Sequence, residues 1–227
     1  MNSVVMSVGG SLIVPDGIDV DFLAGFRKVI LDFVQQGSRV AIIAGGGRTC
    51  RKYNAAAARF NASAEDKDWF GIDSTKLNAR LVWTVLKDVA HPRIIYNPTQ
   101  KIKAKQPVIV GSGWKPGCSS DLDAVLLAKN LGVRTVVNMT NVAQVYDRDP
   151  KKFRDAKPLG RLSWEQMQKI VGTEWTPGMN APFDPVATGL AAKLGLKVII
   201  LGSNLENLRN FLYGKGFRGT VIENGTD

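Results

Sequence analysis

The chain has 227 residues, of which 44% are hydrophobic and 22% are charged, as is typical of one α/β domain or two closely fused lobes. Two cysteines and one histidine exclude a disulfide scaffold, a zinc site of the usual spacing and most mechanisms that need a histidine base. The net charge of +10 indicates a polyanionic partner, which could be nucleotide phosphates, a membrane surface or a nucleic acid.

The first part of the chain predicts two strands that each end in small residues. Residues 3–8 and 39–44 are short apolar runs, typical of buried strands. Gly9–Ser11 follow the first run and Gly45–Gly47 follow the second. Because such residues let a phosphate approach the backbone closely, both turns are candidate phosphate sites.

Helical periodicity predicts three helices in the first ninety residues, at 20–36, 48–60 and 71–90. Arg48 and Arg51 lie one turn apart at the start of the second helix, on one face. Two guanidinium groups beside a helix N-terminus suit a phosphate better than they suit a hydrophobic core.

In the middle of the chain, the sequence predicts a loop at 65–68 and strands at 93–96 and 107–110. A helix at 122–131 and a strand at 133–138 follow. The last three form a βαβ unit, with a loop of small residues at 111–120 where its first strand ends. Ligands bind at that edge of open α/β sheets, and a helix N-terminus there favours an anion. Ser119, Ser120 and Asp121 are all good N-cap residues, so a purely structural turn is the alternative.

In the last part of the chain, residues 147–161 are predicted to be a polar surface segment and residues 172–182 a loop. The same patterns predict helices at 164–171, 184–194 and 205–213 and strands at 197–201 and 219–222. Strands and helices alternate throughout, which predicts an α/β fold with a mostly parallel sheet covered on both faces. Neither G-x-x-x-x-G-K-[ST] nor G-x-G-x-x-G occurs, so any phosphate must be held in another way.

The charge and hydropathy patterns narrow the choice of partner. No apolar run approaches the roughly 20 residues that span a bilayer, and the chain begins directly in a strand-like segment, so we expect a cytoplasmic protein without membrane contact. Basic residues cluster at 93–105 and 151–161 without the interleaved aromatic residues of an RNA-binding surface. This pattern favours nucleotide phosphates over nucleic acid.

Six segments together resemble the amino acid kinase superfamily, and within it the archaeal-type uridylate kinases. They occur in the order of that family: GGSLIVP at 9–15, AGGGRTCRKYN at 44–54, KDWFGIDSTKLNARL at 67–81, GWKPGCSSDLDAVLLA at 113–128, TNVAQVYDRDPKKF at 140–153 and FDPVAT at 183–188. The resemblance covers essentially the whole chain. A single glycine motif is weak, and the ordered set carries the specificity.

This resemblance implies a single domain, residues 1–227, with the three-layer αβα sandwich of the family. Its amino-terminal half would bind the acceptor and its carboxyl-terminal half ATP. The implied reaction transfers the γ-phosphoryl group of MgATP to UMP, giving UDP in pyrimidine nucleotide biosynthesis. Mg²⁺ would be held mostly by phosphate oxygens and water, without a separate protein metal site. The implied assembly is a homohexamer built as a trimer of dimers.

The resemblance also implies roles for individual residues. The expected acceptor site contains Gly46, Asp68, Trp114, Lys115, Pro116, Gly117, Cys118, Ser119 and Ser120, with Asp68 facing the ribose and Arg51 nearby. The expected ATP site contains Gly9, Gly10, Ser11, Gly47, Arg51, Thr140, Asn141, Tyr146 and Asp149. The expected catalytic residues are Asp121, Arg51, Gly9 and Gly10, with Asp121 organising the catalytic groups.

Two positions depart from the family pattern in a way that bears on catalysis or nucleotide choice. At a third, Ser119-Ser120-Asp121 replaces the usual Thr-Thr-Asp and keeps the hydroxyls and the acid. Ser7 stands where many members carry a lysine near the transferred phosphoryl group, which leaves Arg48, Arg51 and Lys115 as candidates for the main cation. Residues 143–144 are Ala-Gln where Asp-Gly is usual, so the choice of nucleotide stays open.

Three alternatives to a UMP kinase remain at this point. One is a related enzyme with another acceptor: isopentenyl phosphate, carbamate or an amino acid carboxylate. Another, suggested by the two departures, is a non-catalytic nucleotide-binding or storage module. The third is a nucleic-acid binder, which the net charge suggests and which predicts steeply salt-dependent affinity.

Overall fold

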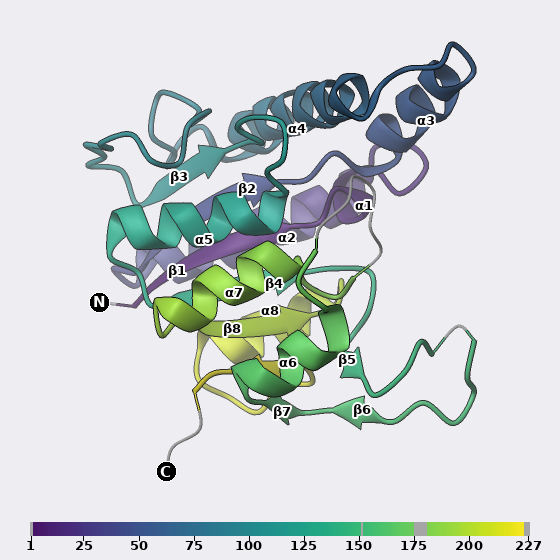
Figure 1. The fold of residues 1–227 in the computed structure, drawn as a ribbon. Helices are drawn as coiled ribbons and strands as arrows, with labels where there is room; N and C mark the ends of the chain where they lie inside the picture. Colours follow the sequence, from purple (N-terminus) through teal and green to yellow (C-terminus); the bar gives the residue numbers. More distant parts are fainter. Residues whose placement is uncertain (1, 151, 175–180, 225–227) are drawn as a thin grey trace.

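The structure is a computed structural model that describes residues 2–150, 152–174 and 181–224. A seven-stranded sheet with the order β3-β2-β1-β4-β8-β9-β7 lies at its centre (Figure 1). Its strands are β1 (Ser3–Val8), β2 (Arg39–Ala44), β3 (Val108–Gly111), β4 (Thr135–Met139), β7 (Arg161–Leu162), β8 (Lys197–Leu201) and β9 (Thr220–Ile222). Only the β8–β9 pair within it is antiparallel, so among the described residues the sheet is mostly parallel, as predicted. Two short strands, β5 (Val145–Tyr146) and β6 (Pro158–Leu159), pair separately.

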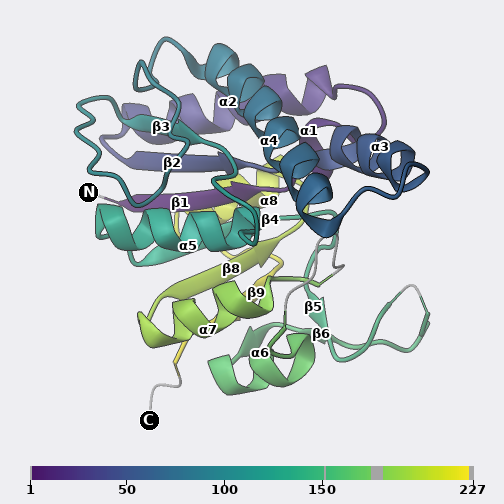
Figure 2. The same cartoon turned by 45° about the horizontal axis from the view of Figure 1, so that its top comes forward.

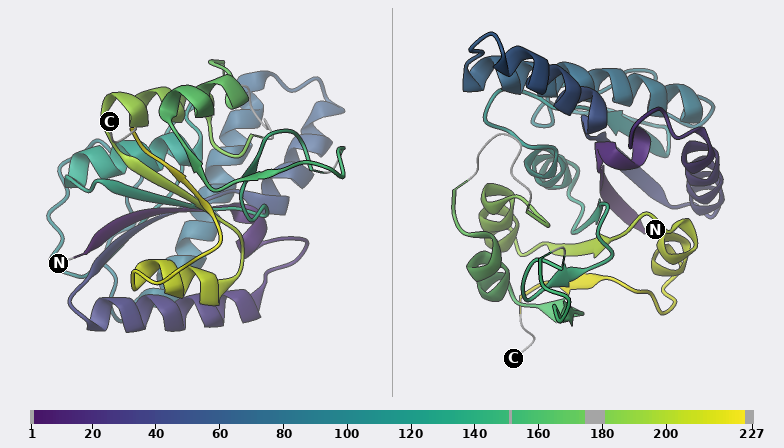
Figure 3. Two further views of the ribbon diagram at one scale, coloured as in Figure 1. Left: turned by 90° about the horizontal axis from the view of Figure 1, so that it is seen from below. Right: turned by 90° about the vertical axis from the view of Figure 1, so that its right-hand side faces the viewer.

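Helices cover both faces of the sheet. They are α1 (Gly10–Ile13), α2 (Val20–Gln35), α3 (Gly47–Ala58), α4 (Ala64–Leu86), α5 (Ser120–Leu131), α6 (Trp164–Val171), α7 (Pro185–Lys193) and α8 (Leu205–Leu212). Helices α2, α4 and α8 pack with Met6 and Ile42, and α5, α6 and α7 pack with Val5 and Ile43. Figure 3 shows the two helical layers with the sheet between them. This is the three-layer αβα sandwich that was expected. No helix in the described ranges has both the length and the hydrophobicity to cross a bilayer.

The register of the parallel strands brings their carboxyl ends to one edge. Val8 at the end of β1 pairs with Ala44 on one side and with Met139 on the other. Met139 pairs in turn with Leu201. The segments that follow β1, β2, β4 and β8 therefore all begin at this edge. Figure 2 shows α1, α3 and β5 gathered there, opposite the start of the chain.

The structure corrects two predicted elements and adds four short ones. The loop predicted at 65–68 is wrong, because Ser63 and Asp66 form a capping box that starts α4 at Ala64. The strand predicted at 93–96 is also wrong, because only isolated bridges from Ala90 and Ile95 contact β3. The short helix α1 and the two-residue strands β5, β6 and β7 were not predicted, and β6 lies within the segment 147–161 that was expected to be a polar surface excursion. The loop predicted at 172–182 lies partly outside the described residues.

Candidate active site

A cavity of about 580 Å³ opens at the carboxyl edge of the sheet, between α3, α4 and the start of α5. Eight residues expected at the acceptor or catalytic site line it: Gly46, Arg51, Asp68, Lys115, Cys118, Ser119, Ser120 and Asp121. Gly47 also lines it, although it was expected at the ATP site. The sequence analysis missed four polar lining residues: Asn54, Lys67, Thr75 and Asp184. All four lie within the six segments that resemble the family, so those segments could have indicated them.

A second cavity, of about 480 Å³, lies beside the first. Four residues expected at the ATP site line it: Thr140, Asn141, Tyr146 and Asp149. Lys169 and Ile170 of α6 also line it, and no sequence motif indicated them. Ala181 lines both cavities, so the two meet there and could hold two ligands side by side.

The glycine turns after β1 and β2 touch each other directly. A Cβ atom on Gly10 would lie 2.0 Å from the amide nitrogen of Gly47, which leaves room only for glycine. Gly47 itself has a φ of +66°, in the left-handed region that favours glycine. The Gly9 amide donates to the Met139 carbonyl at 2.8 Å. The turn at Gly9–Ser11 thus fixes the position of Gly46 and Gly47 in the cavity wall.

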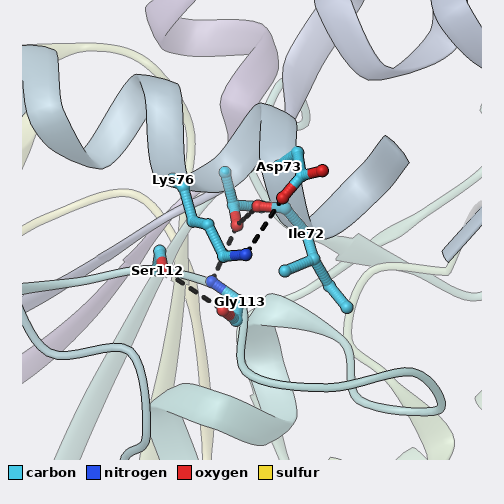
Figure 4. A network of polar contacts seen from close by, with 6 residues as sticks. Ile72, Asp73, Lys76, Ser112 and Gly113 are labelled. Carbon is cyan, nitrogen blue, oxygen red and sulfur yellow. Dashed lines mark hydrogen bonds and ion pairs between the residues drawn. The ribbon is translucent and has the colours of Figure 1, made fainter. Parts of the chain in front are cut away.

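Three backbone amides of the β3–α5 loop, residues 112–119, donate to side chains of the neighbouring helices. Gly113 donates to Thr75 Oγ1 at 2.8 Å, Trp114 to Asp123 Oδ2 at 3.2 Å, and Gly117 to Asp68 Oδ2 at 2.8 Å. Figure 4 shows Gly113 beside the part of α4 that carries Ile72 and Lys76. Asp68 therefore holds the loop as well as lining the cavity.

The side chains of this loop face in different directions. Lys115, Cys118 and Ser119 line the cavity at the sheet edge. Trp114 lines a separate hollow with Trp69, although it was expected in the acceptor site. Lys115 Nζ lies 4.3 Å from the centroid of the Trp114 ring, so the two side chains are in contact. Pro116 and Gly117 form the turn of the loop.

Asp121 is not the N-cap of α5. Ser119 takes that role, since its hydroxyl accepts the Leu122 amide at 3.1 Å. The Asp121 carboxylate instead accepts a hydrogen bond from Ser7 Oγ at 2.9 Å and from the Asp184 amide at 3.2 Å. Burial raises the pKa of Asp121 to about 6, against the lowering effect of the Ser7 hydroxyl. The capping interpretation of Asp121 is therefore wrong, and its carboxylate faces β1 and the start of α7.

Two further buried carboxyl groups accompany Asp121. Burial, together with the smaller effect of the charges of Asp121 and Asp184, raises the pKa of Asp123 to about 7. Burial also raises the pKa of Asp184, which caps α7 by accepting the Ala187 amide at 2.6 Å. Within the described ranges none of the three pairs with a lysine or arginine at ion-pair distance. This group of acids would gain from a cation brought by a ligand.

This acid group predicts that stability falls as the pH rises. A carboxyl group whose pKa is raised on folding binds its proton more tightly in the folded state, so its contribution is full below about pH 4 and is lost as pH rises through the folded pKa. For Asp123, wholly buried, the loss up to about pH 8 is roughly 2–4 kcal/mol. We expect Tm to fall between about pH 5 and pH 8 by about 5 °C more in the parent than in Asp123→Asn. Equal falls measured by calorimetry would contradict the prediction.

The cationic side chains separate into two groups. Arg48 lies outside the cavity lining and pairs with Asp16 at 3.5 Å. Arg51 lines the cavity and forms no ion pair within the described part of the chain. Lys115 and Lys67 also line the cavity, so three cations face it, and Arg48 is not among them.

The two cysteines, Cys50 and Cys118, are half-buried free thiols. Burial raises the pKa of Cys50, and it raises the pKa of Cys118 to about 11. Because the thiolate is the nucleophilic form, neither side chain suits covalent catalysis near neutral pH. The arrangement therefore favours chemistry that depends on positioning and charge.

Comparison with known proteins places the chain in a family. Residues 2–202 match the model of the amino acid kinase family. The chain is 35% identical to a uridylate kinase from Pyrococcus abyssi over 97% of its own length and 99% of that protein. It is 33% identical to a uridylate kinase from Thermoplasma volcanium, with 97% of each chain covered. The crystal structure of uridylate kinase from Archaeoglobus fulgidus superimposes with a TM-score of 0.83 at 28% identity, covering 98% of this chain and all of that one. The chain belongs to the amino acid kinase family.

Proposed function

We propose that this protein is a UMP kinase, which transfers the γ-phosphoryl group of MgATP to UMP and releases UDP and ADP. The observation that supports this most directly is the pair of cavities that meet at Ala181, one lined by cations and the other by four of the residues expected to hold ATP. The relatives named as uridylate kinases cover nearly the whole chain, and they support the choice of acceptor.

In this proposal the acceptor lies in the cavity between α3, α4 and α5. Arg51 and Lys115 bind its phosphate, because a guanidinium and an ammonium group that form no ion pair with any described residue favour an anion. Asp68 lies across the same cavity and accepts a hydrogen bond from the ribose of the acceptor. The amino-terminal half of the single domain thus supplies most of the acceptor site.

The donor nucleotide lies in the neighbouring cavity, beside Thr140, Asn141, Tyr146 and Asp149. Magnesium enters with ATP and supplies charge neutralisation at the transferred phosphoryl group. No cluster of three or more histidine, cysteine or acidic side chains in the described ranges could hold a metal ion. In this proposal the ion is held mainly by phosphate oxygens and water. We also propose that the chain acts as a homo-oligomer, in line with the family pattern.

Catalysis in this proposal comes from positioning and electrostatic stabilisation. The amides of the glycine turns and the cavity cations stabilise charge on the transferred phosphoryl group. Asp121, fixed by Ser7 and by the Asp184 amide, presents a carboxylate that would attract the cation brought by the bound nucleotide. Ser7 can offer only a neutral hydroxyl here, so Arg51, Lys115 and Lys67 supply the positive charge from the cavity.

A coupled assay for ADP tests the function. The protein is incubated with MgATP and, in turn, with each nucleoside monophosphate, isopentenyl phosphate, carbamate and free amino acids. We expect turnover with UMP well above that with every other acceptor. Turnover with a different acceptor would replace UMP in the proposal, and ATP binding without any turnover would support the storage module instead.

Arg51→Ala should lower kcat/KM for UMP by about ten- to a hundredfold. A charge-assisted hydrogen bond is worth roughly 1.5–3 kcal/mol, and the measured ratio reports its loss in the transition state. Arg48→Ala is the matched control, because Arg48 lies one turn away and pairs with Asp16 outside the cavity lining. Equal losses in the two variants would argue against a specific role for Arg51.

A further inference from the structure

Asp123 is the most unusual polar residue in the core. Its side chain is fully buried, and its Oδ1 atom has no hydrogen-bond partner in the described part of the chain. Its other oxygen accepts the amide of Trp114 at 3.2 Å. Buried polar atoms without partners are rare and costly, so each one calls for an explanation.

A contribution to folding stability does not explain why a carboxyl group is buried at position 123. Burying an unpaired charge costs far more than burying an aliphatic side chain of the same shape, and burial raises the pKa of Asp123 so that the neutral form can persist in the core. An uncharged carboxyl group still accepts a hydrogen bond through its carbonyl oxygen. The contact that remains in either protonation state is therefore the one to the Trp114 amide.

The position of Asp123 on α5 links its hydrogen bond with the Trp114 amide to the site around Asp121. Side chains two residues apart on a helix point roughly 200° apart around its axis, so Asp121 and Asp123 lie on nearly opposite faces of α5. Asp121 contacts Ser7 and the amide of Asp184, whereas Asp123 contacts the β3–α5 loop. The first turns of α5 thus connect the loop that lines the acceptor cavity with the carboxylate expected to organise the reaction.

We propose that Asp123 is a positioning residue for acceptor binding. By holding the Trp114 amide it fixes the β3–α5 loop, and with it Lys115 and Cys118, at a set distance from Asp121. This inference rests on the proposed function, because it assumes that the acceptor occupies the cavity beside this loop. It concerns a residue that would touch neither substrate and would act only through the loop.

Two substitutions separate positioning from a general effect on folding. Asp123→Leu has a similar shape and cannot accept the amide, whereas Asp123→Asn keeps an acceptor oxygen. We expect the leucine variant to raise KM for UMP about tenfold, with KM for ATP changed less than twofold. The asparagine variant should have a KM for UMP within about threefold of the parent value. Val29→Ala, in the buried face of α2, is the control for a loss of stability alone, and its KM values should not change.

Hydrogen–deuterium exchange provides a readout that does not depend on the acceptor. The β3–α5 loop should exchange about tenfold faster in Asp123→Leu than in the parent, in Asp123→Asn or in Val29→Ala. Unchanged exchange together with an unchanged KM for UMP would overturn the proposal. If the parent fails to phosphorylate UMP, the proposed function fails, and the exchange result alone then decides whether Asp123 positions the loop. If the leucine variant does not fold, Asp123→Ala takes its place with the same expected outcomes.

Discussion

Asp121→Asn is expected to lower kcat by at least about a hundredfold, a loss of roughly 2.7 kcal/mol or more of transition-state stabilisation. The carboxylate accepts hydrogen bonds from two elements far apart in the chain, the Ser7 hydroxyl and the Asp184 amide. Removing its charge should disturb the cations around the transferred phosphoryl group, and electrostatic positioning provides most of the catalysis in phosphoryl transfer. Steady-state kinetics with UMP and MgATP measures the change.

The same variant should fold almost as well as the parent. The substitution removes one accepted hydrogen bond, which is destabilising, and it also removes a buried charge, which is stabilising. We therefore expect Tm within a few degrees of the parent and unchanged binding of UMP. Asp19→Asn is the control, because Asp19 caps α2 through the Phe22 amide and asparagine caps about as well as aspartate. Near-parental kcat in a folded Asp121→Asn would remove Asp121 from the catalytic residues.

Gly10→Ala should also reduce kcat/KM by about a hundredfold or more, and it should lower Tm. The added methyl group would lie 2.0 Å from the Gly47 amide nitrogen and 2.6 Å from the Gly45 carbonyl carbon, so the two turns must move apart. A displacement of about 1 Å at a reacting centre can cost a hundredfold in rate. Kinetics and thermal melting together measure both effects.

Gly189→Ala is the matched control for that substitution. Gly189 lies inside α7, and a Cβ atom there would have no neighbouring atom within 4 Å in the described structure. Alanine in a helix interior is more stable than glycine by roughly 0.5–1 kcal/mol, so this variant should melt at or above the parental temperature and keep its activity. Parental activity in Gly10→Ala would show that the contact between the turns can relax without affecting the site.

Local sequence signals were sufficient for most of the fold. The apolar runs of β1 and β2 and the amphipathic pattern of α2 lie within one or two residues of the observed bounds. Asp184 and Pro185 predicted the start of α7 correctly, because an N-cap residue followed by proline marks a helix start without any contribution from distant residues. Alternation of such elements was enough to predict the mostly parallel sheet and the helical layers on both faces.

The errors arose where a local pattern had two interpretations. Residues 65–68 are charged because they lie on the exposed first turns of α4, and the cap formed by Ser63 and Asp66 decides in favour of the helix. Residues 93–96 have the composition of a strand, but a strand exists only if a neighbour pairs with it continuously. Here β3 offers only isolated bridges. Composition cannot report whether that partner is in register.

The sequence by itself determined most of the elements, the family resemblance and the residue types that an acceptor and a donor nucleotide would need. Only the tertiary structure decided which of those residues meet. It placed Arg51 in the cavity and Arg48 outside it, added Asp184, and joined Ser7 to Asp121 across 114 positions of sequence. The physical reason is that capping and periodicity depend on neighbours within a few residues, whereas the site depends on the register of parallel strands. That register is set by packing both faces of the sheet at once, and no single segment contains it.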